Sequence, residues 1–250
     1  MPPADPIAEA GTAVPVVADV TDVADVTDGA CGAGFRSGSS SPGRASGECS
    51  ASGTSSVPRH EDLLDRVAEW GPVGTPAGGF HLVPVCLERD LPLIGRWMND
   101  PAAAAFWELA GPQEVTRDHL RAQLAGDGRS VPCLGVLDGA PMSYWEIYRA
   151  DLDPLARHYP ARPHDTGIHL LVGGVAHRGR GLGGLLLRAV ADLVLAQRPT
   201  CTRVIAEPDV RNTPSVAAFL TAGFRFSAEV DLPAKRAALM VRDRSHRLPL

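Results

Sequence analysis

A glycine-rich segment, residues 173–184, joins an apolar run to a candidate amphipathic helix. The apolar run spans residues 167–172, and the helix pattern begins near Leu185. Glycine adopts positive φ angles easily and allows a ligand to approach the backbone closely. The free N–H groups of a helix's first turn, together with the helix dipole, attract anions. The order of strand, glycine-rich turn and helix therefore predicts an α/β protein that binds a phosphate-bearing ligand.

Three kinds of phosphate loop compete for this segment. A Walker A loop ends in Gly-Lys-Ser/Thr, which is excluded because Lys235 is the only lysine of the chain. A dinucleotide fingerprint needs Gly-x-Gly-x-x-Gly within a βαβ unit, and this segment has a different glycine spacing. The third pattern, Arg-x-x-Gly-x-Gly, is met by Arg178, Gly181 and Gly183. It resembles the pyrophosphate loop of the GCN5-related N-acetyltransferases (the GNAT family), which bind acyl-coenzyme A.

Charge and cysteine content argue against several other classes of protein. The formal net charge of −5 gives no overall positive field for nucleic acid. The five cysteines are scattered and form no Cys-x-x-Cys pair, so neither a zinc site nor a disulfide framework is expected. No apolar run approaches the roughly 18 residues that a membrane span needs, and the N-terminus lacks a signal-peptide pattern. We therefore expect a cytoplasmic protein with no metal, no nucleic-acid partner and no membrane partner.

Composition divides the chain into three parts. Residues 1–58 are rich in Ala, Gly, Ser, Pro, Thr and Asp, which predicts a disordered low-complexity tail, with a docking segment as the alternative. In residues 59–75, Leu63, Leu64, Val67 and Trp70 stand at helical spacing. They predict a short helix that packs on the outside of the domain or contacts a partner. Residues 76–245 have a globular pattern.

The globular part predicts alternating strands and helices in the order β-α-α-β-β-β-α-β-α-β. The first strand is expected at Phe80–Leu87. Thr116 is expected as the N-cap of a helix ending at Leu124, and Thr213 as the N-cap of a helix that stops at Gly223. The other expected elements are helical segments at 88–98 and 102–109, a hairpin of 133–137 with 141–148 around Asp138-Gly139, a strand at 167–172, a helix to Gln197, a strand at 203–206 and a β-rich segment at 225–241. This is the order of the GNAT fold. The resemblance implies a mixed, mostly antiparallel α/β (α+β) sheet, splayed between its fourth and fifth strands and flanked by helices.

Further segments resemble one GNAT branch, the hydroxylamine acyltransferases of siderophore biosynthesis that act on N-hydroxylysine or N-hydroxycadaverine. The match covers about Phe80–Arg242. The matching segments are Trp97-Met98-Asn99-Asp100-Pro101 with Phe106-Trp107, Gly139-Ala140-Pro141 with Tyr144-Trp145-Glu146-Ile147-Tyr148, Asp153-Pro154-Leu155 with Tyr159, Gly167-Ile168-His169-Leu170-Leu171, Glu207-Pro208-Asp209-Val210-Arg211-Asn212 and Ala222-Gly223-Phe224. One departure is Arg157-His158-Tyr159, where the branch has a paired Tyr-Tyr.

The resemblance assigns the catalytic positions to His169 and Asp209. An alkylammonium with a pKa near about 10.4 must lose a proton before it can attack a thioester. A hydroxylamine is far less basic and largely neutral at pH 7, so a modest His–Asp arrangement suffices. We expect His169 to act as general base or to orient the acceptor, and Asp209 to bind the hydroxylamine or tune the histidine. The alternatives are a hydrogen-bonded structural histidine and an aspartate that caps a turn.

The remaining site residues are expected on either side of the thioester. Those predicted to contact acetyl-CoA or another acyl-CoA are Leu171, Val172, Arg178, Gly179, Arg180, Gly181, Leu182, Gly183 and Asn212. Those predicted to contact the acceptor are Trp97, Phe106, Trp107, Tyr144 and Glu146. The two arginines could also be solvated surface charges, Asn212 a turn residue, the three early aromatic residues core residues, and Glu146 an outward-facing strand residue.

Three functions follow from these observations. The first is transfer of an acetyl or succinyl group from acyl-CoA to a hydroxylamine nitrogen, which forms a hydroxamate for a siderophore. The second is aminoglycoside N-acetylation, which an acidic acceptor cleft would favour. The third is a non-catalytic acyl-CoA-binding regulatory domain. The expected partners are a small-molecule hydroxylamine or amine acceptor and acyl-CoA, with a homodimer as a further option.

Overall fold

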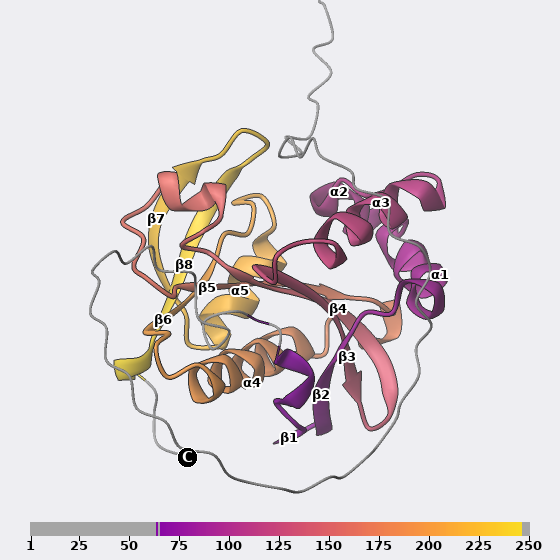
Figure 1. Ribbon diagram of the computed structural model, residues 1–250, viewed down its shortest axis with the longest axis horizontal. Helices are drawn as coiled ribbons and strands as arrows, with labels where there is room; N and C mark the ends of the chain where they lie inside the picture. Colours follow the sequence, from indigo (N-terminus) through magenta and orange to yellow (C-terminus); the bar gives the residue numbers. More distant parts are fainter. Residues whose placement is uncertain (1–63, 65, 247–250) are drawn as a thin grey trace, which may run out of the picture. The chain divides into compact units, whose positions relative to one another are not determined.

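The computed structural model describes Leu64 and residues 66–246. The predicted tail, residues 1–58, lies outside the described residues. Within them, one eight-stranded sheet has the order β1-β2-β3-β4-β5-β6-β8-β7 (Figure 1). Its strands are β1 (Val73–Thr75), β2 (Gly78–Pro84), β3 (Ser130–Leu137), β4 (Ala140–Arg149), β5 (Thr166–Val172), β6 (Arg203–Ala206), β7 (Arg225–Asp231) and β8 (Arg236–Asp243).

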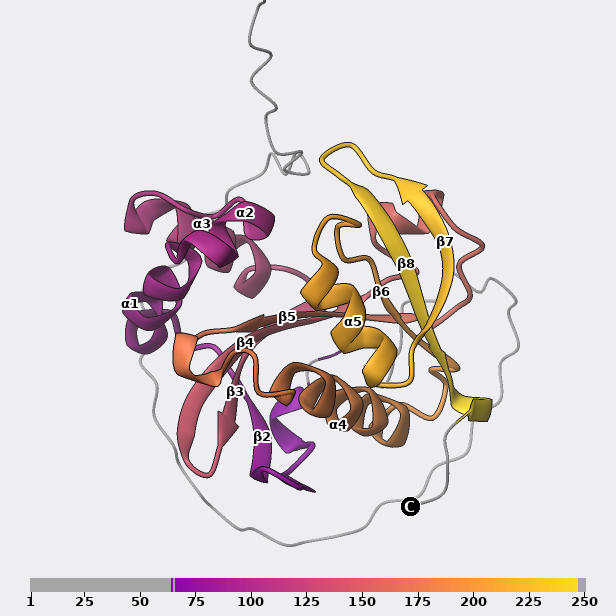
Figure 2. The same ribbon diagram turned by 180° about the vertical axis from the view of Figure 1, so that it is seen from behind.

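Helices flank the sheet on both faces. Their bounds are α1 (Leu87–Met98), α2 (Pro101–Trp107), α3 (Gln113–Leu124), α4 (Leu182–Gln197) and α5 (Thr213–Thr221). Figure 1 shows α1, α2 and α3 grouped at one side, and Figure 2 shows α4 and α5 together in front of the strands. None of the described helices is long and apolar enough to cross a membrane.

The sheet opens between β5 and β6. These two strands are parallel, and they pair only at Thr166 with Val204 and at Gly167 with Ile205. In contrast, β4 remains paired with β5 as far as Val172. The edge of β5 therefore separates from β6 beyond Gly167, which confirms the predicted splay between the fourth and fifth strands of the expected order.

Alternation along β4 distributes its side chains between the two faces. Trp145 and Ile147 are buried in the apolar cluster that includes α4 residues such as Leu187. Tyr144 and Tyr148 belong to two other apolar clusters, the first with α1 and the second with β7 and β8. Because successive strand residues point to opposite faces, Glu146 shares the face of Tyr144 and Tyr148. It therefore lies between their two clusters.

The hairpin turn agrees with the sequence prediction. Asp138 and Gly139 both have positive φ angles, 47° and 82°. Two central residues in this region define the tight turn that matches the twist of antiparallel strands. The predicted Asp-Gly hairpin between β3 and β4 is thus confirmed.

Several boundaries differ from the prediction, and three of them have a clear local cause. β2 ends at Pro84 rather than at Leu87, because Cys86 becomes the N-cap of α1. Thr116 is not an N-cap: α3 begins three residues earlier, and this threonine is buried inside the helix. The N-cap of α5 is Asn212, not Thr213, since the Asn212 side chain accepts the N–H of Ser215. An amide oxygen satisfies a first-turn N–H at this position.

The segment before β1 packs inward. Only Leu64 and residues 66–75 of the predicted helical linker are described, and they contain one short 3₁₀ turn, η2 (Val67–Glu69). Leu64, Val67 and Trp70 are buried in the same cluster as α4. These side chains therefore contribute to the core, in contrast to the expected helix on the outside.

Candidate functional site

Two cavities meet where β5 and β6 separate. The larger has a volume of about 610 Å³ and lies among α2, the end of β5, the start of α4, and α5. The smaller has a volume of about 230 Å³ and lies over β5, β6 and the loop that follows β6. Residues that line both cavities are Phe106, Trp107, Leu170, Asn212, Ser215 and Phe219. Two molecules bound in these cavities can therefore approach each other at the splay.

The larger cavity gathers most of the residues predicted to bind the cofactor. Its lining includes Leu171, Val172, Arg178, Gly179, Gly181, Leu182, Gly183 and Asn212. Arg180, the remaining predicted residue, is exposed and is not among the lining residues. A cavity of this size suits an extended ligand such as the pantetheine arm of coenzyme A.

The glycine-rich segment shapes one end of this cavity. Gly179 and Gly181 have φ angles of 70° and 75°, in the left-handed region that glycine tolerates best. Gly181 is the N-cap of α4 and offers no capping side chain. The first-turn N–H groups of this 16-residue helix are thus available to an anion, and the helix dipole adds to the attraction.

Arg178 holds this loop together. Its Nη1 lies 2.6 Å from Asp100 Oδ1. Its Nε donates to the Val172 carbonyl and its Nη2 to the Gly173 carbonyl, both at 3.0 Å. Asp100 is also the N-cap of α2. The guanidinium therefore joins the glycine-rich segment to α2 and the end of β5, which is a structural role in addition to the predicted one.

The smaller cavity contains a histidine between two carboxylates. His169 Nδ1 lies 2.8 Å from Glu146 Oε2, and His169 Nε2 lies 2.5 Å from Glu207 Oε1. A carboxylate only accepts hydrogen bonds, so each ring nitrogen must donate. His169 is therefore an imidazolium in this geometry.

Strand register explains how these groups come together. Glu146 of β4 stands opposite His169 of β5, and Tyr148 stands opposite Gly167. A Cβ at Gly167 would lie 2.0 Å from the Tyr148 ring, so only glycine lets the ring lie over this strand. The Tyr148 hydroxyl donates to Glu207 Oε2 at 2.7 Å. The glycine of the Gly167-Ile168-His169 motif thus helps to position Glu207.

The charges in this cluster shift each other's pKa values. Burial alone lowers the pKa of His169, but the charge of Glu207 and hydrogen bonds to both carboxylates raise it to about 10. Burial alone raises the pKa of Glu207, yet the His169 imidazolium lowers it to about 2. Hydrogen bonds from His119 and His169 likewise outweigh burial and hold the pKa of Glu146 far below its usual range. At neutral pH the cluster is one cation between two anions.

Helix α3 closes the cluster from the other side. Its His119 Nε2 lies 2.7 Å from Glu146 Oε1, and Gln123 Nε2 donates to the same oxygen at 2.6 Å. The Tyr144 hydroxyl also donates to that oxygen, at 3.0 Å. These contacts fix the Glu146 carboxylate and leave its other oxygen for His169. Among the described residues, no group of three or more metal-ligating side chains has a geometry that could hold an ion.

Asp209 lines the smaller cavity but is not bonded to His169. Its carboxylate pairs with Arg211, with Nη2 2.6 Å from Oδ2, and accepts the Arg211 backbone N–H at 2.8 Å. These hydrogen bonds lower the pKa of Asp209. The structure therefore brings His169 and Asp209 to one cavity, and the carboxylate that contacts the histidine belongs to Glu207.

The aromatic residues predicted to contact the acceptor separate into two groups. Phe106 and Trp107 line both cavities, and the Trp107 ring lies edge-on to that of His169 with centroids 6.1 Å apart. Trp97 lines neither cavity and packs against Gly173, where a Cβ would meet its ring at 2.1 Å. Tyr144 is fully buried and reaches the site only through its hydrogen bond to Glu146.

Sequence reasoning missed Glu207, His119 and Lys235, which also line the smaller cavity. Glu207 stands directly after β6, and His169 stands on the neighbouring β5. Parallel neighbours place such positions at one edge of a sheet, so the strand order carried a signal for Glu207. His119 and Lys235 come from distant elements, and only the tertiary structure brings them to the site.

Residues 86–232 match the model of the "Acetyltransferase (GNAT) domain". The lysine N-acyltransferase MbtK of Mycolicibacterium paratuberculosis is 40% identical, over 62% of this chain and 69% of that protein. The N(6)-hydroxylysine O-acetyltransferase of Escherichia coli is 38% identical, over 63% of this chain and 50% of that protein.

Solved structures show the same fold. An uncharacterised protein from Bacillus halodurans has a TM-score of 0.66 and 32% identity. This match covers 70% of the present chain and 90% of the B. halodurans chain. The aminoglycoside acetyltransferase AAC(6')-Ib, in complex with coenzyme A and kanamycin, has a TM-score of 0.59 and 25% identity. That match covers 66% of this chain and 95% of the other.

Proposed function

Because the chain belongs to the GNAT acetyltransferase family, we propose that it acylates the hydroxylamine nitrogen of a hydroxylated lysine or diamine. The product is a hydroxamate of the kind that siderophores use to bind iron. It is an acyl-CoA-dependent acyltransferase, as its family implies. The meeting of the two cavities beside His169 carries the proposal, because it gives the acyl donor and the acceptor adjoining sites.

The larger cavity is the acyl-CoA site in this proposal. The pyrophosphate lies at the N-terminus of α4, where Gly181 and Gly183 leave the backbone N–H groups open. The exposed Arg180 supplies the counter-charge there, while Arg178 keeps the loop in place through Asp100. The thioester then lies along Leu171 and Val172, at the open edge of β5.

The smaller cavity holds the acceptor, with its nitrogen beside the His169 cluster. The nitrogen lone pair attacks the thioester carbon, the C–S bond breaks, and the nitrogen gives up its proton. His169 is already protonated, so it orients the acceptor, and the Glu207 carboxylate takes the proton. Glu207 then passes this proton to the leaving CoA thiolate, which restores the carboxylate. Asp209 binds the acceptor at the rim of the cavity.

A neutral nucleophile fits this arrangement. A primary amine is protonated at neutral pH and needs a strong base to remove its proton. His169 does not offer a neutral imidazole for that purpose, since both of its ring nitrogens are bonded to carboxylates. A hydroxylamine arrives neutral and loses a proton only after its attack.

The test is CoA release from acetyl-CoA and succinyl-CoA with three acceptors: N6-hydroxylysine, N-hydroxycadaverine and kanamycin. We expect turnover on a hydroxylamine, reduced by about 10²-fold or more in His169→Ala and in Asp209→Asn. His81→Ala, a histidine on β2 outside both cavities, is the matched control and should retain activity.

Other outcomes would redirect the assignment. Turnover on kanamycin alone would place the protein with the aminoglycoside acetyltransferases. Binding of acyl-CoA without turnover on any of the three acceptors would contradict the proposal and favour a regulatory acyl-CoA-binding domain.

A further inference from the structure

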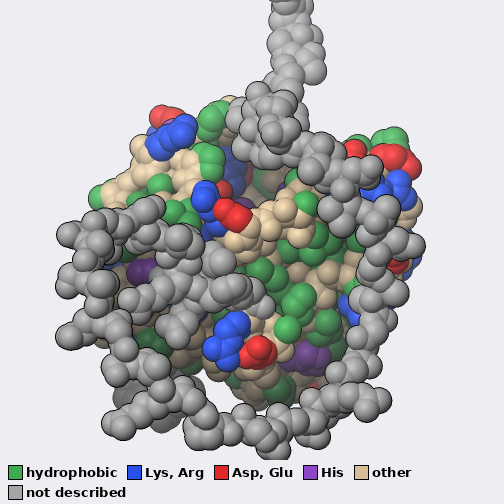
Figure 3. Space-filling view, viewed as in Figure 1, with side chains coloured by type: hydrophobic (Ala, Val, Ile, Leu, Met, Phe, Trp, Pro, Cys, Tyr) green, Lys and Arg blue, Asp and Glu red, His purple; other side chains and the backbone are tan. Residues whose placement is uncertain are grey.

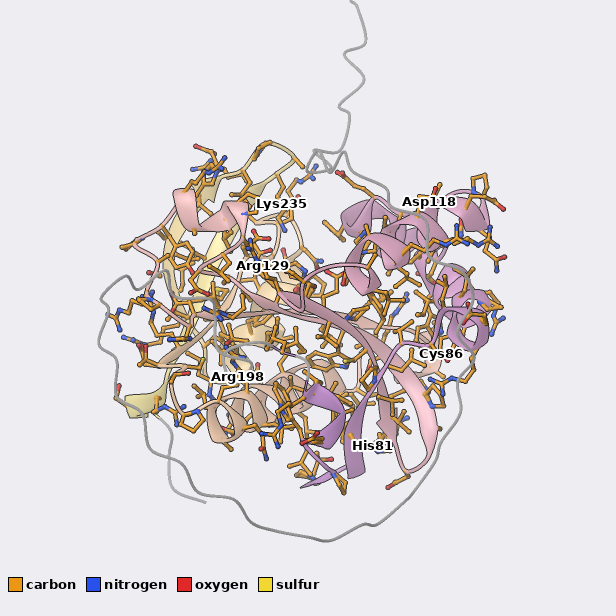
Figure 4. The ribbon with its side chains drawn as sticks, viewed as in Figure 1. His81, Cys86, Asp118, Arg129, Arg198 and Lys235 are labelled. Carbon is orange, nitrogen blue, oxygen red and sulfur yellow. The ribbon has the colours of Figure 1, made fainter. Side chains whose placement is uncertain are left out.

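Lys235 lies beside the reacting end of the smaller cavity. It belongs to the tight turn between β7 and β8, in which Leu232 and Lys235 exchange backbone hydrogen bonds of 2.9 and 3.3 Å. Figure 4 shows it on the inner side of this hairpin, toward the middle of the molecule. Its side chain lines the cavity together with His169 and Glu207. A rigid hairpin thus places one cation at the site.

The ammonium group has donors to spare. Its Nζ lies 3.8 Å from Glu207 Oε1, which is too long for a direct hydrogen bond. Among the described residues, no side-chain hydrogen bond holds this ammonium group. Glu207 Oε1 is also the oxygen 2.5 Å from His169 Nε2. A ligand atom beside that oxygen is therefore within reach of Lys235.

The residue type matters at this position. Of the 24 Lys and Arg residues in the chain, only residue 235 is a lysine. An arginine here could form a planar, two-point pair with Glu207 and occupy that carboxylate. Lysine instead presents a compact charge with three donors, so the carboxylate stays available and the donors face the cavity.

We propose that Lys235 binds the hydroxyl oxygen on the acceptor nitrogen and thereby selects hydroxylamines over the parent amines. This inference rests on the proposed function, since it requires a hydroxylamine acceptor. The oxygen of a neutral hydroxylamine accepts a hydrogen bond from the ammonium. A parent amine has no such oxygen. Because it is protonated at neutral pH, it also meets in Lys235 a cation of its own sign.

The carboxylates of the cavity do not reverse this selection. Glu207 is already countered by His169 and Lys235, and Glu146 by His169. Asp209 pairs with Arg211. A protonated amine thus finds no unpaired anion among these three carboxylates.

A carboxylate on the acceptor is a less suitable partner for Lys235. In N6-hydroxylysine the α-carboxylate stands at the opposite end of the aliphatic chain from the reacting nitrogen. Lys235 is close to Glu207 and therefore to the reacting nitrogen. The same contact is available to N-hydroxycadaverine, which has no carboxylate, and this difference makes the inference testable.

The experiment compares kcat/KM of the full chain and its Lys235→Met and Lys235→Arg variants. The acceptors are N6-hydroxylysine and N-hydroxycadaverine, and the parent amines lysine and cadaverine serve both as substrates and as competitive inhibitors. We expect Lys235→Met to lose about 10- to 100-fold on both hydroxylamines, as for a hydrogen bond to a charged group. The inhibition constants of the amines should stay unchanged or fall, and Lys235→Arg should recover part of the activity.

Arg236→Met is the matched control, because Arg236 stands on the same hairpin and pairs with Glu229 outside the cavity. It should leave the hydroxylamine-to-amine ratio unchanged. A loss in Lys235→Met on N6-hydroxylysine alone would show that Lys235 binds the carboxylate and would overturn the inference. An equal loss on amines and hydroxylamines would also overturn it. If the wild type acylates neither hydroxylamine, the proposed function itself fails, and that result is visible before any variant is made.

Discussion

At the scale of single residues, the site depends on opposite charges that stabilise one another. His169 has a carboxylate on each ring nitrogen, and each carboxylate has further donors, Tyr148 for Glu207 and Tyr144 for Glu146. Charge-assisted hydrogen bonds of this kind are shorter and stronger than neutral ones. The protonation state of His169 is therefore set by its two carboxylate partners rather than by its exposure to water.

Glu207→Gln should lower the pKa of His169 from about 10, because one of the two anions that hold its proton is removed. An NMR titration of the His169 ring protons measures this pKa directly. Asp209→Asn is the control: its carboxylate pairs with Arg211, so the titration should hardly move. An unchanged His169 midpoint in Glu207→Gln would contradict the arrangement.

The same substitution should change how stability depends on pH. The folded pKa of His169 is raised above its ordinary value of 6.5, so its stabilising contribution is complete below 6.5 and is lost as the pH rises toward about 10. We expect the wild type to lose unfolding free energy across this window and Glu207→Gln to lose less of it. Urea unfolding at a series of pH values provides the comparison, and parallel curves would count against the linkage.

At the scale of elements, α4 and α5 must approach closely to form one wall of the larger cavity. A Cβ at Gly184 would lie 3.1 Å from the Thr221 side chain and 3.2 Å from the Ala218 carbonyl. At the neighbouring Gly183 a Cβ would meet only Ala218 Cβ at 3.6 Å, an ordinary contact. The two glycines thus differ in what they make room for, although they are adjacent in one helix.

Gly184→Ala should therefore be less stable than Gly183→Ala by about 1–3 kcal/mol, the usual cost of overpacking. Both changes gain the same helix propensity over glycine, so their difference isolates the contact with α5. Equilibrium urea unfolding of the two variants measures it. Equal stabilities would mean that α5 moves aside at little cost.

At the scale of the molecule, the first described residues complete the core. Leu64, Val67 and Trp70 have 1%, 1% and 8% of their surface exposed and pack in the cluster that contains α4. The Leu64 N–H also donates to the Gly128 carbonyl at 3.2 Å. Charges are mixed on the face seen in Figure 3, where acidic and basic side chains lie next to each other beside hydrophobic ones.

Two deletions test where along the chain the folded core begins. Removal of residues 1–58 should leave acyltransfer and thermal stability nearly unchanged, because their composition predicts a disordered tail. Removal of residues 1–70 should unfold the protein, since each large buried side chain contributes about 2–5 kcal/mol against a total of about 5–15 kcal/mol. Leu64→Ala in the full chain should alone lower the unfolding free energy by about 2–5 kcal/mol. Equal melting temperatures for the two deletions would contradict this division of the chain.

The sequence by itself determined the family, most of the element order, and the strand and helix on either side of the glycine-rich segment. It did not predict β1 or the division of the last β-rich segment into β7 and β8. These depend on local patterns: the periodicity of 167–172 and 185–197, the Asp138-Gly139 turn, and glycines whose φ angles only a few residue types tolerate. Only the tertiary structure decided the partners within the site. Glu207 rather than Asp209 contacts His169, Arg178 braces the loop through Asp100, and Trp97 packs away from both cavities. Such pairings depend on strand register and side-chain packing between elements far apart in the chain, and residue order alone does not specify either one.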